Sequence, residues 1–390
     1  MGDPSQARAK ASLFVCGDIV NRSRQDGLVC TDELARIIAG ADYSACNFEA
    51  AIGGHGSAQP KVGPHLQQSA ATIDGLKSQG FDLLLLANNH IMDYGPPALA
   101  ATIERATAAG LDTLGAGLDA SQAYRPLIKQ INGLKLALLN AGEAQFGVID
   151  HFRRPTTAGY AWINHPTIDA TIRRMKDTCD FVVVFVHAGL ENYPIPQKEW
   201  RARYRQLCDL GADAVVASHP HAPQGYERHG ESLIFYSLGN FFFDRARGSG
   251  KEDRSYAVRL ELERGRPPTF QPVFHVTLDG RVGLAADDRK IDLDALCDKL
   301  GEGYDQAHDR MSLEAYQLYR QRLSAALAPE SPIRKVKRAL RRLLGSAPKK
   351  PDREGQKTLM QLHLLRNEAY CLAARHALEI QARESTDKQA

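Results

Sequence analysis

The sequence lacks the features that would assign the chain to several specialised classes of protein. Its seven cysteines are scattered and include no CxxC pair, which favours reduced thiols over a disulfide framework. Its 49 lysines and arginines nearly balance its 46 aspartates and glutamates. The resulting net charge of +3 is too small to predict a nucleic-acid partner. No apolar run approaches the roughly 18 residues of a membrane-spanning helix, and the N-terminal segment shows neither a signal peptide nor an anchor. We therefore expect a cytoplasmic protein.

No P-loop, dinucleotide fingerprint or internal repeat is present, which argues against nucleotide-binding, solenoid and propeller folds. The composition is otherwise ordinary, with 43% hydrophobic and 24% charged residues. These values are typical of a folded globular protein. The 390 residues are enough for two or three domains.

Short apolar runs alternate with helical patterns over the first half of the chain. Continuous apolar runs are typical of strands that are buried on both faces of a sheet. The predicted strands cover residues 13–18, 82–90, 134–143, 180–189 and 212–221. The predicted helices between them cover residues 69–80, 95–110, 165–178 and 197–211. This order indicates a layered α/β domain.

The pattern changes twice in the second half. From residue 232 it becomes rich in strands that extend or cap the sheet, and after residue 287 it becomes helical and charged. We therefore predict a catalytic domain over residues 1–287 and a helical C-terminal appendage over residues 288–390.

Polar residues cluster where the predicted strands end. Because ligands gather at the carboxyl ends of strands in open α/β sheets, we expect these side chains to meet at one rim. Carboxylate, amide and imidazole ligands together suit Mn²⁺, Zn²⁺ or Fe²⁺. In an extended segment the imidazoles of His219 and His221 would point to the same side, each toward its own ion, which favours two divalent ions. The residues at these strand ends are Asp18, Glu49, Asn88, Asn89, His90, His187, His219 and His221.

Six motifs in this order carry a family resemblance: GD, NFE, ANNHIMDYG, HAGLE, SHPH and YSLGNFFFD. Together they resemble the CapA-type capsule-synthesis family, also called poly-γ-glutamate synthesis proteins, which is similar to the calcineurin-like metallophosphoesterases. The resemblance covers about residues 11–245. It implies an α/β (α+β) fold, a four-layer αββα metallophosphoesterase-like sandwich.

The resemblance also implies roles for individual residues. Asp18 and His221 would bind the first metal ion, Glu49 would bridge, and Asn89, His187 and His219 would bind the second. His90 would act as the catalytic acid, with Asp93 orienting it and Glu191 orienting His187. One position departs from the superfamily, because Val20 stands where a ligand histidine is usual, two residues after the first aspartate. The predicted substrate-binding residues are Asn88, Asn240 and Asp244, with Arg245 and Arg247 as anion contacts.

The resulting hypothesis is a dinuclear metal-dependent hydrolase in biosynthesis or turnover of a capsule or surface polymer such as poly-γ-glutamate. A phosphoester is the preferred substrate and an amide the alternative. A second hypothesis is a non-catalytic accessory or scaffold protein of a polymer synthesis or export complex.

Two C-terminal segments suggest further contacts. Residues 333–344 form a basic amphipathic pattern that suits an anionic membrane surface or a synthesis complex. A helix predicted over residues 358–382 has an apolar face suited to another helix, of this chain or of a second copy in a homo-oligomer.

Overall fold

The computed structural model describes residues 9–152, 154–244, 253–278, 280–328 and 353–387. The chain forms two compact units. The first contains Met1–Gln59 and His65–His308, and the second contains Pro60–Pro64 and Asp309–Ala390. Within the described residues, no helix is both long and apolar enough to cross a membrane.

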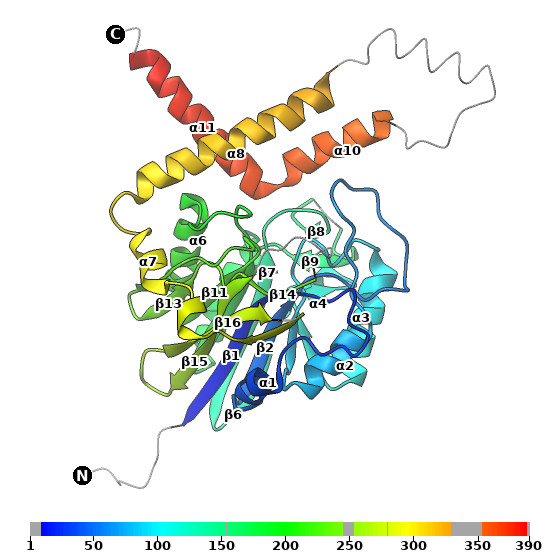
Figure 1. Cartoon of the computed structure of the whole chain (residues 1–390), viewed down its shortest axis with the longest axis vertical. Helices are drawn as coiled ribbons and strands as arrows, with labels where there is room; N and C mark the ends of the chain where they lie inside the picture. Colours follow the sequence, from blue (N-terminus) through cyan, green and yellow to red (C-terminus); the bar gives the residue numbers. More distant parts are fainter. Residues whose placement is uncertain (1–8, 153, 245–252, 279, 329–352, 388–390) are drawn as a thin grey trace, which may run out of the picture. The chain divides into compact units, whose positions relative to one another are not determined.

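The first unit is built on two large sheets (Figure 1). The strands of the first sheet run in the order β17-β16-β15-β1-β2-β3-β4, and β14 pairs with the end of β1. Strands β1 to β4 are parallel to one another, so their carboxyl ends lie at the same edge. The bounds are β1 Lys10–Val20, β2 Tyr43–Phe48, β3 Leu83–Leu85, β4 Asp112–Leu114, β14 Asn240–Phe243, β15 Arg254–Glu263, β16 Thr269–Leu278 and β17 Arg281–Leu284.

The second sheet runs in the order β12-β13-β11-β10-β7-β6, with β7, β10, β11 and β13 parallel. Its strands are β6 Leu127–Ile131, β7 Leu134–Gly142, β10 Phe181–His187, β11 Ala214–Ser218, β12 Tyr226–His229 and β13 Ser232–Phe235. A small third sheet follows the order β5-β9-β8. It contains β5 Ala116–Gly117, β8 Val148–Ile149 and β9 Gly159–Ala161.

The alternation of side chains along β1 shows how the layers stack. Leu13 and Val15 are buried in one core with Leu136 and Val183 of the second sheet, so the two sheets pack face to face. Phe14, like Cys16, points the other way, into a core that it shares with three helices. These helices are α1 Asp32–Ala39, α2 Ala71–Ser78 and α3 Pro96–Ala108.

On the second sheet, α5 (Pro166–Lys176) packs on β10 and α6 (Lys198–Asp209) packs on β11. The predicted four-layer αββα sandwich is therefore confirmed. The four predicted helices all form within two residues of the expected ends, because each amphipathic pattern has a sheet to cover.

Two predicted strands differ from the structure. The strand expected over residues 82–90 ends at Leu85, and residues after it form a loop, because the polar side chains of Asn88 to His90 take the chain out of the sheet. The strand expected over residues 212–221 likewise ends early, at Ser218, the last residue of β11. Helix α1, which follows the N-cap Thr31, was not predicted.

The first unit extends past residue 287, where the sequence pattern changes, to His308. Helix α7 (Leu293–Asp298) and the first turn of α8 (Tyr304–Leu327) belong to it. Tyr304 donates a hydrogen bond from its hydroxyl to the carbonyl of Pro196 (3.0 Å), and Arg201 of α6 donates to the carbonyl of Leu300 (2.9 Å). These contacts fix the segment to the first unit.

The second unit is helical, as expected, and contains most of α8 together with α10 (Arg353–Arg366) and α11 (Glu368–Asp387). The single helix predicted over residues 358–382 is wrong: the chain breaks at Asn367, whose Oδ1 accepts from the backbone N–H of Tyr370 (2.9 Å) and starts α11. Leu364 and Ala374 pack against Tyr319 of α8, so the apolar face has a partner within the chain. The basic segment 333–344 lies outside the described residues.

A close backbone approach fixes the end of β1. A Cβ atom placed on Gly17 would lie 1.8 Å from the carbonyl oxygen of Gly239. The backbone N–H of the next residue, Asp18, donates to that same oxygen (3.2 Å). Glycine at position 17 thus allows β14 to come close enough to hold the Asp18 backbone.

Replacing Gly17 with alanine is therefore expected to lower the free energy of unfolding by about 3 kcal/mol, since neither backbone can move without breaking sheet pairing. Urea unfolding at unchanged m-value would measure the change. Gly301→Ala is the matched control, because its Cβ would meet nothing closer than 3.3 Å. A Gly17→Ala protein as stable as this control would contradict a close approach of the two backbones at Gly17.

Candidate metal centre

Side chains from the carboxyl ends of both sheets meet in one buried cluster, as the sequence predicted. Asp18 lies near the end of β1, Glu49 follows β2, His187 ends β10, and His219 and His221 follow β11. These residues form two groups of potential ligand atoms, and the atoms within each group all lie within 4.8 Å of one another. One group contains Asp18, Glu49 and His221, the other contains Glu49, His187 and His219, and Glu49 is common to both.

The second group is held by contacts around His187. Its Nε2 lies 4.0 Å from Glu49 Oε1 and 3.1 Å from Asn89 Oδ1. The rings of His187 and His219 have centroids 4.6 Å apart. Asn89, predicted as a ligand of the second ion, therefore lies with the two imidazoles and the carboxylate that were assigned to the same ion.

The first group is held by Asp18. His221 Nδ1 lies 3.4 Å from Asp18 Oδ2 and 2.9 Å from Asn240 Oδ1. Asn47, which the sequence analysis did not select, lies between the groups: its Nδ2 donates to Asp18 Oδ1 (2.7 Å) and lies 3.1 Å from His187 Nδ1. Asn47 thus fixes the Asp18 carboxylate relative to His187.

Atoms without hydrogen-bond partners show what the cluster could hold. Within the described structure, both carboxylate oxygens of Glu49 and Nδ1 of His219 are buried and have no hydrogen-bond partner. Burial, together with the negative charge of Asp18, raises the pKa of Glu49 well above its usual value. Leaving such groups unpaired is costly, whereas cations between them would satisfy all three atoms. The donor set therefore fits divalent ions of the Mn²⁺, Zn²⁺ or Fe²⁺ kind.

The imidazoles differ in charge. Burial lowers the pKa of His187 well below its usual value and that of His219 to about 4, so both rings are neutral at pH 7. Burial also acts to lower the pKa of His221, but the charges of Glu49 and Asp18 outweigh it and raise the pKa to about 10. Neutral imidazole is the form that ligates metals, so His187 and His219 are ready to ligate.

The backbone is strained around the ligands. Ala50, which follows Glu49, has φ 116°, and His219 and His221 have φ 103° and 56°. The extended conformation expected for the His219–His221 segment is therefore wrong, although both imidazoles face the cluster. A non-glycine residue with positive φ costs of order 1–3 kcal/mol, and such residues concentrate at functional sites.

His90 borders the cluster and does not belong to either ligand group. Its Nδ1 lies 2.7 Å from Asp93 Oδ2, and its Nε2 lies 4.0 Å from Glu49 Oε1. The same Asp93 oxygen accepts from the backbone N–H of Leu66 (2.8 Å). Asp93 thus holds one nitrogen of the ring and turns the other toward the cluster, the geometry of an acid or base beside a reacting group.

Glu143 and Gln145 were missed by the sequence analysis. Glu143 Oε1 lies 3.6 Å from His219 Nε2, and Gln145 Nε2 lies 3.1 Å from the same nitrogen. Glu143 also accepts from the backbone N–H of Gly189 (3.0 Å). The two side chains hold the Nε2 edge of His219 and leave its Nδ1 toward the cluster. A signal was present, because Glu143 follows the apolar run of β7 as the other cluster residues follow theirs.

The residues predicted to bind substrate differ in their surroundings. Asn88 is fully buried and its amide pairs with the backbone of Phe48 and His90, which holds the turn. Asp244 Oδ2 accepts from the backbone N–H groups of Arg22 and Ser23. Asn240 alone lies in the cluster, with a buried Nδ2 that has no partner in the described structure. Arg245 and Arg247 lie outside the described residues.

Two further residues named from the sequence, Val20 and Glu191, lie near the cluster. Val20 is fully buried in a small apolar group with Ala50 and Leu66, so its side chain offers no ligand atom to the Asp18 side of the cluster. The charge of Glu191 acts to raise the pKa of both His219 and His221, although burial outweighs it at His219. Its predicted role beside His187 stays a prediction.

Comparison with known proteins places these residues in a family. The model of the family described as "Bacterial capsule synthesis protein PGA_cap" matches residues 12–245, more than half of the chain. The capsule biosynthesis protein CapA of Bacillus anthracis is 32% identical over 240 residues, covering 58% of this chain and 56% of that protein. The PGA biosynthesis protein CapA of Bacillus subtilis (strain 168) is 33% identical over 239 residues, covering 60% of this chain and 61% of that protein.

A solved structure of a phosphatase from Mycoplasma pneumoniae superposes with a TM-score of 0.43 at 14% identity, covering 69% of this chain and 95% of that one. This chain spans about three fifths of the length of the curated relatives that it matches. The matched residues include every member of the buried cluster. The chain belongs to the bacterial capsule synthesis protein (PGA_cap) family.

Proposed function

We propose that the chain is a dinuclear metal-dependent hydrolase. The observation that carries this proposal is the shared, buried Glu49 carboxylate, which has no hydrogen-bond partner in the described structure and lies between two groups of potential ligands. Asp18, Glu49 and His221 would hold one divalent cation, and Glu49, Asn89, His187 and His219 the other. When bound, two such cations would neutralise charge on a scissile phosphoester or amide and favour attack by water.

The residues of the chain supply the rest of the chemistry. His90 would donate a proton from Nε2 to the leaving group, because Asp93 accepts the Nδ1 proton and stabilises the charged ring. Asn47 and Asn240 would fix the carboxylate of Asp18 and the imidazole of His221. Glu143 and Gln145 would orient His219. The cluster is better suited to a phosphoester than to an amide, because the cations would neutralise the negative charge of the phosphoester.

The biological setting that we propose is the assembly or turnover of an anionic surface polymer. The two CapA relatives are named for capsule and PGA biosynthesis. Since the match covers only part of each relative, the polymer itself is part of the proposal. Poly-γ-glutamate would present an amide, and a phosphate-containing precursor would present the preferred ester.

Metal content and turnover test the proposal together. Full-length protein purified without chelator is expected to contain close to two divalent ions and to hydrolyse a bis-aryl phosphodiester. Chelator should abolish turnover, and Mn²⁺, Zn²⁺ or Fe²⁺ should restore it. Asp18→Ala/His221→Ala should lose one ion and at least about 100-fold in kcat, because each cation contributes several kcal/mol to charge stabilisation.

His229→Ala is the matched control for these measurements, because this imidazole pairs with Asp209 near the end of β12, outside the cluster. It should keep both ions and full turnover. Protein that binds no metal under any of these conditions would refute the proposal, and bound metal without phosphodiester turnover would redirect it to amide substrates.

The role of His90 has a separate test. His90→Gln is expected to lower kcat by about 10²-fold or more while metal content stays at the wild-type value, because a general acid contributes that much. Asp93→Asn should lower kcat less and should displace the alkaline limb of the pH–rate profile, because a general acid must be protonated to act. An aryl substrate with a very acidic leaving phenol should recover most of the rate in His90→Gln. Full activity of that variant on ordinary substrates would exclude the role.

A second candidate function is that of a non-catalytic accessory or scaffold protein. Val20 favours it, because an apolar side chain replaces a usual ligand on the Asp18 side of the cluster. A single bound ion with no turnover on either ester or amide would support this candidate over the hydrolase.

A further inference from the structure

A second cavity lies apart from the metal centre in the first unit. Its volume is about 680 Å³, within the range of small-molecule sites. It is lined by α4 (Ala120–Ala123) and the residues just after it, by the end of β8 and the residues that follow, and by one side of α5 from Thr167 to Arg174. No residue of the metal centre lines it.

The lining is rich in positively charged and titratable side chains. Arg125 and Arg174 line it. Both are exposed, and within the described part of the chain neither guanidinium makes an ion pair or a hydrogen bond. His151 and His165 also line it, with ring centroids 4.7 Å apart. Asp150 is the single carboxylate among the lining residues. Two guanidinium groups therefore line the cavity without a carboxylate partner in the described structure.

His165 presents a defined donor to the cavity. Its Nδ1 accepts a hydrogen bond from the backbone N–H of Thr167 (3.2 Å) at the start of α5. Burial, and secondarily the neighbouring His151, lowers the pKa of His165, so the ring is neutral at pH 7. A neutral ring that accepts at Nδ1 carries its proton on Nε2. The cavity wall thus offers a neutral N–H donor in addition to the two guanidinium groups.

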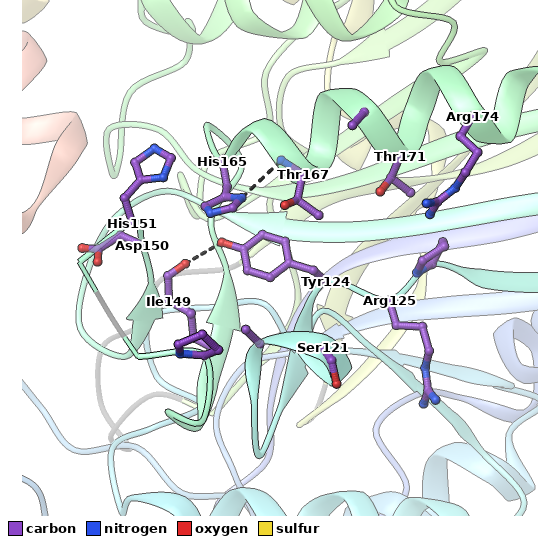
Figure 2. Close-up of a pocket in the computed structure, with 14 residues that line it drawn as sticks. Ser121, Tyr124, Arg125, Ile149, Asp150, His151, His165, Thr167, Thr171 and Arg174 are labelled. Atoms are coloured by element: carbon purple, nitrogen blue, oxygen red, sulfur yellow. Dashed lines mark hydrogen bonds between the residues drawn. The ribbon is translucent and has the colours of Figure 1, made fainter.

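The imidazole groups and the guanidinium groups lie on opposite sides of the cavity (Figure 2). Figure 2 shows the imidazoles of His151 and His165 on one side of Tyr124 and the side chains of Arg125 and Arg174 on the other. Tyr124 is fixed between them, because its hydroxyl donates to the carbonyl of Ile149 (2.5 Å) and accepts from the N–H of Trp162 (3.0 Å). A single compact anion would engage one of these places, whereas an extended ligand with two anionic groups would engage both.

We propose that this cavity is a metal-independent binding site for an oligo-anion, a chain that carries two or more carboxylate or phosphate groups. Guanidinium groups bind both kinds of oxyanion through paired N–H donors. The existence of the site does not depend on hydrolysis at the metal centre.

The chain connects this site with the metal centre. The segment that leaves β7 contributes Glu143 and Gln145 to the metal centre and, a few residues later, Asp150 and His151 to the cavity. Tyr160 of β9 strengthens this connection, because its hydroxyl donates to the carbonyl of Glu143 (2.8 Å). That the oligo-anion is a segment of the same polymer on which the metal centre acts rests on the proposed function.

Calorimetric titration of the metal-loaded full-length protein tests the site. Two probes distinguish the sources of the oxyanion: a synthetic tetramer of γ-linked glutamate and inorganic tripolyphosphate. We expect at least one probe to bind, and Arg125→Gln/Arg174→Gln to weaken its Kd tenfold or more. Tighter binding of the tetramer identifies a carboxylate site, and tighter binding of tripolyphosphate identifies a phosphate site.

The matched control is Arg36→Gln/Arg173→Gln, which removes the same charge from exposed positions on α1 and α5 that do not line the cavity. It should bind as the wild type does, and both double variants should keep wild-type turnover of the small aryl phosphodiester. Equal affinity of the two double variants, or no binding of either probe to the wild type, would overturn the proposal.

A measurement that leaves every cavity residue unchanged guards against misfolded cavity variants. The imidazole C–H resonances of His151 and His165 should shift on addition of the bound probe, in the wild type and in Asp18→Ala alike. Unchanged resonances would refute the site. Because Asp18→Ala disables the metal centre, a shift that persists there separates this proposal from the proposed hydrolase.

Discussion

The structure of the centre depends on one buried carboxylate. Glu49 is fully buried and, within the described residues, accepts no hydrogen bond, although it lies beside Asp18, His90 and His187. An ionised carboxylate in such surroundings costs several kcal/mol unless charge compensates for it. The strained backbone at Ala50, His219 and His221 adds a further cost. The rest of the fold must therefore offset the cost of the buried carboxylate and of the strained backbone. Divalent cations would be the simplest way to compensate for the buried negative charge.

Two packed sheets provide that rigidity. Glu49 is attached to the first sheet by its backbone N–H, which donates to the carbonyl of Ile19 (3.1 Å). His187 is the last residue of β10 in the second sheet, and its carbonyl accepts from the N–H of Glu143 (3.0 Å). The core between the sheets, with Leu13 facing Leu136 and Val183, therefore sets the separation between the carboxylate and the imidazoles. A change in sheet packing would act directly on ligand geometry.

The sequence was sufficient for the layers and for much of the cluster, because both follow from local patterns. A continuous apolar run buries both faces of a strand, and a polar residue directly after it must lie at the strand's end, as Asp18, His187 and His219 do. Contacts between segments could not be predicted. Asn47, in the NFE motif, was given no role because nothing local shows that its amide reaches both Asp18 and His187. The break at Asn367 was missed for the opposite reason, since the apolar periodicity continues through it.

Residues that were given a functional role from motif order alone show a further limit. Asn88 and Asp244 lie beside cluster residues in sequence, yet their side chains hold backbone N–H and C=O groups of the turns that carry the cluster. Motif order identifies the loop that matters and leaves open which side chain in that loop faces the ligand.

The two halves of the cluster are unequal, and this inequality is the strongest constraint on how the centre can work. On the side of Asp18, Val20 packs with Ala50 and Leu66 and supplies no donor. On the opposite side, Glu143 and Gln145 hold the edge of His219, and Asn89 adds an oxygen beside His187. Since affinity rises with the number of donors and with their support from neighbouring groups, the half with His187 and His219 should hold its cation more tightly. Glu49 belongs to both halves, so a cation in the stronger half would fix the carboxylate on which the weaker half depends.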